Sequence, residues 1–540
     1  MKKRNFNPNN YYKLNNLRKK VINDIKTKID LNNKKILEIG CGNGTFTSLF
    51  ANQQKNTYIN AIDIVKNYID YAKKANYHEN IYYEVNTISN VKSTFDCIFM
   101  VFSLTELLKK NKIEEILNDL NNKNLKDGYV IIVDEFEDDY TEEYDLLGLK
   151  ILKTLGYKYL CFKDFEEKIL KSNYELIYTK LYENKQNITN IHGSKLQIYY
   201  ENKLNEYDKT KNKNSEDIWN MYKDEIEQLG GIRTYNKSRL IILKKKNNII
   251  EQLKKIQSDL YLYYSLNRIE DNIKYYQDLP IENLNYVFPV KSFPNKKIMD
   301  LFYKYNFYYD ASHQTEDELV KKYKTKVFYS DPTGKIVNNS SIRLNIAGIN
   351  SHFGKEYDEK SYEIYHIHLS HPKTNKLKNT IINELKKLNY KKTKYLNIGG
   401  GYDKLSYLEL KNYLEQIRKV VPKKVTILLE AGSLWFKDTG YLIAKVEHIE
   451  NIRGLKFVYL NACRTLHSKW SIPNYMNINK GKEEYIICGA SCDEKDLFAH
   501  VYNSKLKVND KVYFNKIEPY SYSFNTTFNG IDKAEVIIDE

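Results

Sequence analysis

The chain has 540 residues, enough for two or three domains with substantial cores. It carries 85 Lys and Arg against 69 Asp and Glu, a formal net charge of +16. These basic residues are scattered among acidic ones and form no stripe, which predicts a solvated surface and disfavours a nucleic-acid partner.

The sequence shows no sign of export or of a membrane span. No run of about 18 apolar residues occurs, and the basic N-terminus lacks the apolar core of a signal peptide. The six cysteines have no CxxC spacing, which is typical of a reducing compartment. We therefore expect a soluble cytoplasmic protein.

The first structural motif is "KKILEIGCGNGTFTSLFA" at residues 34–51, which predicts a strand, a glycine turn and a helix. Gly40, Gly42 and Gly44 allow backbone dihedrals that a Cβ forbids and allow a ligand to approach closely. A glycine turn of this kind is compatible with any nucleotide-binding fold.

The following segments continue the alternation of strands and helices. "YINAIDIV" (58–65) predicts a strand ending at Asp63, where an acid can accept both ribose hydroxyls. "FDCIFMVFSLTELL" (95–108) and "LKDGYVIIVDEFE" (125–137) add further strands. This order predicts a Rossmann-like, doubly wound parallel sheet.

These motifs together resemble class I S-adenosylmethionine-dependent methyltransferases over about residues 10–245, through Glu38, Gly40, Gly42, Gly44, Asp63, "FDCI" and "LKDGYVIIVDE". The resemblance implies that the glycine turn holds the methionine part of S-adenosyl-L-methionine, Asp63 the ribose, and Asn86 or Thr87 the adenine side. Relatives on this scaffold transfer methyl, aminopropyl or aminocarboxypropyl groups, and the motifs do not decide among them. A plain NAD-binding domain is the alternative, disfavoured by the GxGxG spacing.

The second half begins after a polar stretch near residue 250. Short strands alternate with helix-like segments and predict a (β/α)8 TIM barrel. These strands are expected at 307–312, 326–330, 341–348, 363–370, 394–401 and 425–432. Beyond about residue 434 the helical pattern fades into a C-terminal β domain. The predicted domains are 1–250, 251–433 and 434–540.

Lys291 stands out in "YVFPVKSFPN" (286–295), because it ends a short apolar run with no acid among the ten residues. Burial disfavours the charged form of a lysine. The local sequence therefore predicts a depressed pKa and a usable nucleophile.

Around this lysine the second half resembles fold-type III pyridoxal-phosphate decarboxylases of the ornithine, diaminopimelate and carboxynorspermidine group, over about residues 255–540. The residues that carry the resemblance are Lys291, Asp310, Glu316, Arg343, His368, Gly399, Gly400, Gly401, Glu430, Cys492, Asp493 and Tyr520. They lie in ordered motifs such as "YYDASHQTEDELV", "LNIGGG", "LLEAG" and "GASCDEKD".

The resemblance implies a role for each residue. Lys291 forms a Schiff base with pyridoxal 5'-phosphate, and Glu430 pairs with the ring nitrogen. Gly399–Gly401 and Tyr520 contact the phosphate, and His368 stacks on the ring. Asp310 and Arg343 are further cofactor-binding candidates, and Glu316 is a substrate-binding candidate.

The resemblance also implies a homodimer. Cys492, with Asp493, corresponds to the loop that reaches into the neighbouring barrel to reprotonate the product. Alternatives stay open: Cys492 as an inert thiol, a monomer whose loop folds back on its own barrel, Gly399–Gly401 as an ordinary loop, and a zinc site at His366, His368 and His371.

Two departures from the family pattern bear on the substrate. Relatives have Glu-Pro-Gly-Arg where this chain has Glu-Ala-Gly-Ser (430–433), so a phosphate contact is in doubt. "LNACRTLH" (460–467) lacks the acid that ornithine decarboxylases use for the distal amine, and its Arg464 could hold an anion. "LEAGSLWFKDTGYLIAKV" and "NTTFNGI" most resemble the carboxynorspermidine branch.

The pairing of halves predicts a bifunctional enzyme. A 3-amino-3-carboxypropyl group transferred by the first half could lose CO2 in the second and leave an aminopropyl group. This resembles the maturation of microcin C-type peptide-nucleotide antibiotics and implies a small-molecule or peptide-nucleotide substrate. The alternatives are a methyltransferase fused to an independent polyamine-type decarboxylase, and a non-catalytic regulator.

Overall fold

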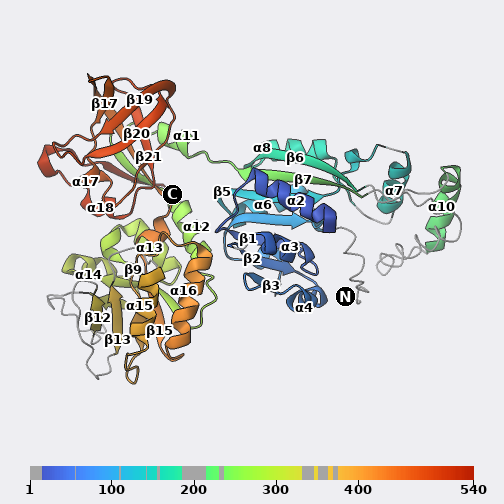
Figure 1. Cartoon of the computed structure of the whole chain (residues 1–540), viewed down its shortest axis with the longest axis horizontal. Helices are drawn as coiled ribbons and strands as arrows, with labels where there is room; N and C mark the ends of the chain where they lie inside the picture. Colours follow the sequence, from blue (N-terminus) through green and yellow to red (C-terminus); the bar gives the residue numbers. More distant parts are fainter. Residues whose placement is uncertain are drawn as a thin grey trace. The chain divides into compact units, whose positions relative to one another are not determined.

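The computed structural model describes residues 15–54, 56–108, 111–141, 143–154, 158–184, 215–229, 236–330, 346–350, 363–368 and 375–539. The chain divides into two compact units, Met1–Asn247 and Asn248–Glu540 (Figure 1). The six cysteines are free thiols.

Unit 1 is built on one seven-stranded sheet in the order β3-β2-β1-β4-β5-β7-β6. Its strands are β1 (Lys35–Ile39), β2 (Tyr58–Asp63), β3 (Ile81–Val85), β4 (Phe95–Val101), β5 (Asn124–Asp134), β6 (Tyr174–Asn184) and β7 (Asn236–Lys245). The first five are parallel, and β7 runs antiparallel to both β5 and β6. The strand order reverses between β1 and β4, which places a crevice at their carboxyl ends. The predicted doubly wound sheet is confirmed.

Helices cover both faces of this sheet. They are α2 (Asn15–Lys28), α3 (Thr45–Gln53), α4 (Lys66–Ala75), α5 (Leu104–Leu108), α6 (Ile113–Lys123) and α8 (Phe162–Lys171), with short 3-10 turns η1 (Ile88–Asn90) and η2 (Glu137–Asp139). Two further helices, α7 (Glu143–Thr154) and α10 (Ser215–Gln228), contact each other, with Lys150 paired to Glu225 at 2.8 Å. Residues 97–101 of β4 form a continuous apolar run, as a strand buried on both faces requires.

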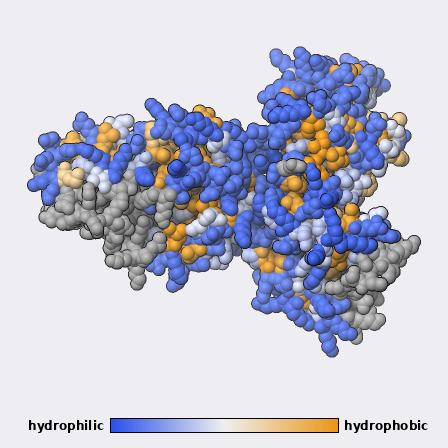
Figure 2. All heavy atoms as spheres, turned by 180° about the vertical axis from the view of Figure 1, so that it is seen from behind, coloured by the Kyte–Doolittle hydropathy of each residue, from blue (hydrophilic) through white to orange (hydrophobic). Residues whose placement is uncertain are grey.

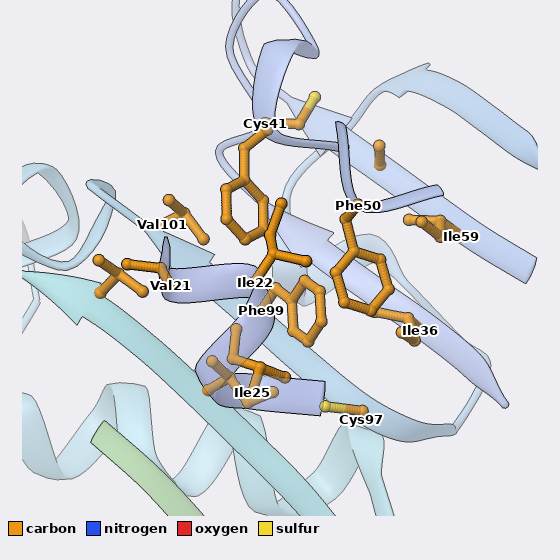
Figure 3. Close-up of a cluster of buried hydrophobic side chains, with 14 of the residues drawn as sticks. Val21, Ile22, Ile25, Ile36, Cys41, Phe50, Ile59, Cys97, Phe99 and Val101 are labelled. Carbon is orange, nitrogen blue, oxygen red and sulfur yellow. The ribbon is translucent and has the colours of Figure 1, made fainter. Parts of the chain in front are cut away.

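Successive residues of β4 enter different cores. Phe99 packs on the α2 and α3 side, where Phe50 meets it edge-on with ring centroids 4.9 Å apart. Figure 3 shows Val21, Ile22 and Ile25 of α2 in the same cluster. Ile98 and Met100 point to the opposite face, toward a second cluster that contains residues of α6 and α8.

The first part of unit 2 is a curled parallel sheet in the order β11-β10-β9-β15-β14-β13-β12. Its strands are β9 (Leu284–Pro289), β10 (Tyr308–Ala311), β11 (Val327–Tyr329), β12 (Ile346–Asn350), β13 (Ile364–His368), β14 (Tyr395–Asn397) and β15 (Thr426–Glu430). The last strand pairs with the first, as barrel closure requires. Between them lie α13 (Lys296–Lys304), α14 (Gln314–Val320), α15 (Asn375–Leu385) and α16 (Tyr407–Val420). The barrel prediction is confirmed, and part of the expected strand at 341–348 lies outside the described residues.

The remainder of unit 2 is the predicted β domain. Its strands are β8 (Tyr261–Tyr264), β16 (Gly440–Ile452), β17 (Leu455–Leu460), β18 (Asn474–Tyr475), β19 (Lys480–Cys488), β20 (Leu497–Ser504), β21 (Lys511–Asn515) and β22 (Glu535–Ile538). The short helices α11 (Ile249–Lys254), α17 (Arg464–His467) and α18 (Tyr520–Phe524) accompany them, and α12 (Leu266–Tyr276) leads into the barrel.

One part of the expected domain division needs correction. We assigned residues from 251 onward to the barrel, but β8 pairs antiparallel with β16 and parallel with β22 in the β domain. All four residues of β8 are buried. A strand buried between two neighbours is stabilised by pairing on both edges, and its partners here come from the far end of the chain.

Figure 2 shows hydrophilic residues over most of the visible face, with hydrophobic residues in smaller groups. In the part of the chain that the structure describes, no helix has both the length and the apolar character needed to cross a bilayer.

Candidate active sites

The glycine turn after β1 is held in a conformation that requires glycine. Gly40, Gly42 and Gly44 have φ values of 71°, 54° and 76°. A Cβ on Gly40 would lie 2.7 Å from the Cβ of Ser103, and one on Gly44 would lie 2.5 Å from the hydroxyl of Tyr83. A Cβ on Gly42 would meet nothing within 4 Å. Gly42 therefore presents bare backbone to open space, as a ligand-binding turn must.

Two acids flank this turn, one on β1 and one on β2. Asp63, at the end of β2, accepts hydrogen bonds from the backbone N–H of Gly42 (2.9 Å) and of Val65 (2.8 Å). Glu38 of β1 is buried, and burial raises its pKa to about 7; the charge of Asp63 adds to this, while Thr47 and Arg18 oppose it. The carboxylate expected to hold a ribose thus also fixes the glycine turn.

Asn86 follows β3 and lies beside Asp63. Its backbone N–H donates to the carbonyl of Asp63 (3.1 Å), and its side-chain amide donates to Glu84 (3.1 Å). Thr87 is exposed, and its N–H donates to the Asn86 side-chain oxygen (2.8 Å). The structure thus brings the predicted residues to one edge of the sheet. The bare backbone at Gly42 beside an acid fits S-adenosylmethionine.

Sequence reasoning missed Asp134, at the end of β5. Its carboxylate accepts hydrogen bonds from the N–H of Leu104 (2.8 Å) and from the hydroxyl of Thr105 (3.0 Å). Burial raises its pKa to about 6, although these hydrogen bonds oppose the shift. Asp134 therefore fixes the start of α5 at the same edge as the glycine turn. The signal was present in "VIIVDE", an acid directly after a buried strand.

In unit 2, Lys291 lies in the 3-10 turn Val290–Ser292 that follows β9. Its carbonyl accepts a hydrogen bond from Ser523 of α18 (2.9 Å), so the β domain contacts the barrel here. A pocket of ≈ 470 Å³ opens beside it. The pocket lining includes Lys291, Thr315, Glu316, Leu319, Tyr522 and Ser523.

The predicted depression of the Lys291 pKa is wrong. Burial does act to lower it, but the charges of Glu430, Asp310, Tyr520 and Glu316 outweigh burial, so the pKa of Lys291 is raised. The ten-residue window around Lys291 contains no acid, yet strands distant in the sequence bring several. The ammonium is thus stabilised within this cluster of acids.

Glu430 ends β15 in a buried position, 4% exposed. Its carboxylate accepts a hydrogen bond from the side-chain amide of Asn397 (2.6 Å), and His366 Nε2 lies 3.6 Å from the same oxygen. Burial raises the pKa of Glu430, while Lys291 and Asn397 oppose the shift. A protonated pyridine nitrogen requires a carboxylate partner, and Glu430 offers a buried one near Lys291.

Sequence reasoning did not assign Asn397, and it weighed His366 only as a member of a zinc site. Asn397 also accepts a hydrogen bond from the N–H of Gly399 (2.8 Å), so it links Glu430 to the glycine loop. His366 lies on β13, two residues before the end of the strand. The predicted stacking role of His368 lies outside what is described, because its side chain is not placed.

Asp310 is fully buried at the end of β10. One oxygen accepts a hydrogen bond from Ser330 (2.6 Å), and the other makes none to any residue the structure describes. Burial, then the charge of Glu430, raises the pKa of Asp310 to about 7, while Lys291 opposes the shift. Glu316 accepts a hydrogen bond from the N–H of Ser312 (2.7 Å). Asp310 thus offers an acceptor to whatever occupies the space near Lys291.

The glycine loop after β14 approaches the same place. Gly399 and Gly401 have φ values of 65° and 84°. A Cβ on Gly400 would lie 3.0 Å from the carbonyl of Glu430, and one on Gly432 would lie 3.3 Å from the hydroxyl of Tyr520. Burial and the neighbouring acids raise the pKa of Tyr520, against the effect of Lys291. A lysine, a buried acid, a glycine loop and a phenol therefore converge, and this set fits pyridoxal phosphate.

Other predicted residues lie apart from Lys291. Cys492 is exposed, and the Asp493 carboxylate accepts a hydrogen bond from the N–H of Lys495 (2.9 Å). The guanidinium of Arg464 donates to the carbonyl of Leu497 (3.0 Å). No contact among the described residues joins these three to Lys291. Arg343 lies outside the described residues.

Comparison with known proteins agrees with the character of unit 1. Residues 36–128 match the family described as a methyltransferase domain. This stretch contains the glycine turn, Asp63 and Asn86. No curated protein matches the chain.

Solved structures resemble about half of the chain. The arginine decarboxylase of Paramecium bursaria Chlorella virus bound to agmatine has 16% identity and a TM-score of 0.45, covering 54% of this chain and 100% of that chain. The lysine/ornithine decarboxylase of Vibrio vulnificus with putrescine has 16% identity and a TM-score of 0.45, covering 54% and 98%. The carboxynorspermidine decarboxylase of Campylobacter jejuni with norspermidine has 18% identity and a TM-score of 0.43, covering 52% and 94%.

Proposed function

We propose that the chain is a bifunctional enzyme that transfers a 3-amino-3-carboxypropyl group from S-adenosylmethionine to an acceptor and then decarboxylates the product to leave an aminopropyl group. The observation that carries the proposal is the convergence of Lys291, Glu430 and the Gly399–Gly401 loop on a chain that also bears an open glycine turn at Gly42. The first step creates an amino acid and the second consumes one.

The transferase step would take place at the carboxyl edge of the unit 1 sheet. When bound, S-adenosylmethionine supplies an activated aminocarboxypropyl group, whose carbon–sulfur bond breaks as the acceptor attacks and methylthioadenosine leaves. Asp63 holds Gly42 so that its backbone faces the donor, and Asn86 lies next to Asp63 on the adenine side.

The decarboxylation would take place at Lys291. When bound, pyridoxal phosphate supplies a sink for the electron pair left by departing CO2. Lys291 would hold pyridoxal phosphate, and Glu430 would keep a proton on its ring nitrogen. Asn397 would keep Glu430 in place through its hydrogen bond to the carboxylate. Gly399–Gly401 and Tyr520 hold the phosphate. One buried carboxylate oxygen of Asp310 accepts no hydrogen bond from a described residue, so Asp310 would orient polar groups near Lys291.

Each decarboxylase site would also require a second chain. We propose a homodimer in which the exposed loop of Cys492 and Asp493 enters the partner's barrel. A Lys291→Ala chain and a Cys492→Ala chain should each be nearly inactive and, after subunit exchange, recover about a quarter of wild-type activity. No recovery despite proven exchange would contradict the shared site.

The pairing resembles the aminopropylation of microcin C-type peptide-nucleotide antibiotics, so such a nucleotide is the acceptor to test first. Mass analysis of acceptor incubated with S-adenosylmethionine and pyridoxal phosphate would test the order of steps. Wild-type enzyme should add an aminopropyl group, and Lys291→Ala should stop at the aminocarboxypropyl adduct. A product that gains only a methyl group would contradict the proposal.

The match of residues 36–128 to a methyltransferase domain favours one other function. In that case unit 1 transfers methyl and unit 2 is an independent polyamine-type decarboxylase, whose cationic substrate would be held by Glu316 in the Lys291 pocket. Release of CO2 from carboxynorspermidine or ornithine without S-adenosylmethionine would support it.

A further inference from the structure

Unit 1 contains a pocket whose lining includes none of the predicted cofactor-binding residues. It has a volume of ≈ 550 Å³ and lies among the loop before α6, η2 and the segment before α8. Its polar wall carries four lysines, Lys112, Lys153, Lys158 and Lys168. Leu108, Ile113 and Leu160 supply apolar surface, and Tyr159 adds an aromatic ring to the lining.

The lysines give this pocket an excess of positive charge. Lys153 pairs with Glu137 at 2.6 Å, and Lys168 pairs with Glu114. These two glutamates are the acids that line the pocket. The lining therefore carries two more lysines than glutamates, and a bound anion would reduce this excess of positive charge.

The pocket is connected to the carboxyl edge of the sheet through Tyr159. Burial raises the pKa of Tyr159, and the charges of Glu135, Asp134 and Glu106 add to the shift. Asp134 in turn holds the start of α5 through Leu104. The residue before Leu104 is Ser103, whose side chain faces Gly40 of the glycine turn. The pocket and the turn thus share one edge, at the ends of β4 and β5.

We infer that this pocket binds the acceptor of the transferase through an anionic group, a phosphate or a carboxylate, with the apolar wall and Tyr159 contacting the uncharged remainder. The inference rests on the proposed function, because it assigns the acceptor site of that reaction. In this arrangement the lysines hold the acceptor's charge at the outer wall. Its nucleophilic atom lies toward the glycine turn.

Calorimetric titration of the full chain with phenyl phosphate, benzoate and phenol tests this site. All three compounds share an aromatic ring, so phenol serves as the neutral control for the two anions. Comparison of phenyl phosphate with benzoate separates phosphate recognition from carboxylate recognition. The test variant is Lys112→Gln with Lys158→Gln, two exposed lysines of the pocket. The matched control is Lys73→Gln with Lys74→Gln, which removes the same charge from exposed positions on α4.

We expect wild type to bind at least one anion and not phenol, and the pocket variant to bind that anion about tenfold or more weakly. The control should stay within about twofold, and S-adenosylhomocysteine should bind all three proteins equally. Equal weakening in both variants, or no anion binding by wild type, would overturn the inference. If group transfer then persists, the proposed function stands without this pocket. Anion binding by a chain that transfers no group would overturn the assignment as an acceptor site.

Discussion

Replacing Asn397 by alanine would separate two parts of the decarboxylase site that one amide now joins. The Asn397 side chain donates to Glu430 (2.6 Å) and accepts from the N–H of Gly399 (2.8 Å). Asn397 is 1% exposed and Glu430 is 4% exposed. Water therefore cannot readily replace either hydrogen bond in the variant.

The expected loss follows from these two bonds. A hydrogen bond to a charged group contributes about 1.5–3 kcal/mol and a neutral one about 0.5–1.5 kcal/mol, so Asn397→Ala should lower the free energy of unfolding of unit 2 by about 2–4.5 kcal/mol. The pKa of Glu430 should rise further, because the Asn397 hydrogen bond acts to lower it. A carboxyl with a higher pKa is a weaker counter-charge for the ring nitrogen, so pyridoxal phosphate should bind more weakly.

Urea unfolding followed by tryptophan fluorescence, which includes the signal of Trp435, fully buried in unit 2, would measure the first effect. Absorbance titration with pyridoxal phosphate would measure the second. Asn412→Ala is the control, since Asn412 is exposed on α16 and its loss should change stability by no more than about 0.5 kcal/mol. If Asn397→Ala behaves like this control in both assays, the linking role of Asn397 is refuted.

Three other changes have expected outcomes. Gly40→Ala should lower the free energy of unfolding by about 2–4 kcal/mol, because of its positive φ and the contact with Ser103. Gly42→Ala should lower it by only about 1–2 kcal/mol, yet it should reduce the affinity for S-adenosylhomocysteine, measured by calorimetry, more than this stability loss suggests. The pKa of buried His467 is lowered from 6.5 to about 4, so the folded chain disfavours its protonated form. The free energy of unfolding should therefore fall by up to about 3 kcal/mol as the pH drops from 6.5 to 4. In His467→Gln, the urea midpoint should not show this dependence on pH. Asp539→Ala removes the acceptor of Tyr263 (2.6 Å) and Ser265 (3.0 Å) and should lower the thermal midpoint of unit 2, unlike an exposed Asp493→Ala change.

The parts of the fold predicted correctly are those encoded locally. The glycine turn follows from its spacing, because Gly40, Gly42 and Gly44 all adopt a positive φ, which glycine reaches without the penalty of a Cβ. The apolar run of β4 likewise reveals a strand buried on both faces. By contrast, β8 was placed in the wrong domain because its partners β16 and β22 are distant in the sequence.

The same distinction applies to the site. The identity of Lys291 could be read from its motif, but its pKa could not, since Glu430 and Asp310 reach it from other strands. Asn397 was overlooked because an amide next to a glycine loop has no distinctive sequence pattern. Its importance lies in a hydrogen bond to Glu430, which only the pairing of β14 with β15 brings close.

The central claim is that one carboxyl group, delivered in unit 1, is removed in unit 2. The direct measurement uses S-adenosylmethionine labelled with carbon-13 in its carboxyl group, with acceptor and pyridoxal phosphate, and follows labelled CO2. The account predicts labelled CO2 from wild type in the presence of acceptor and none from Lys291→Ala, whose product keeps the label. Transfer of an unlabelled methyl group to the acceptor, with no labelled CO2 released, would contradict the account.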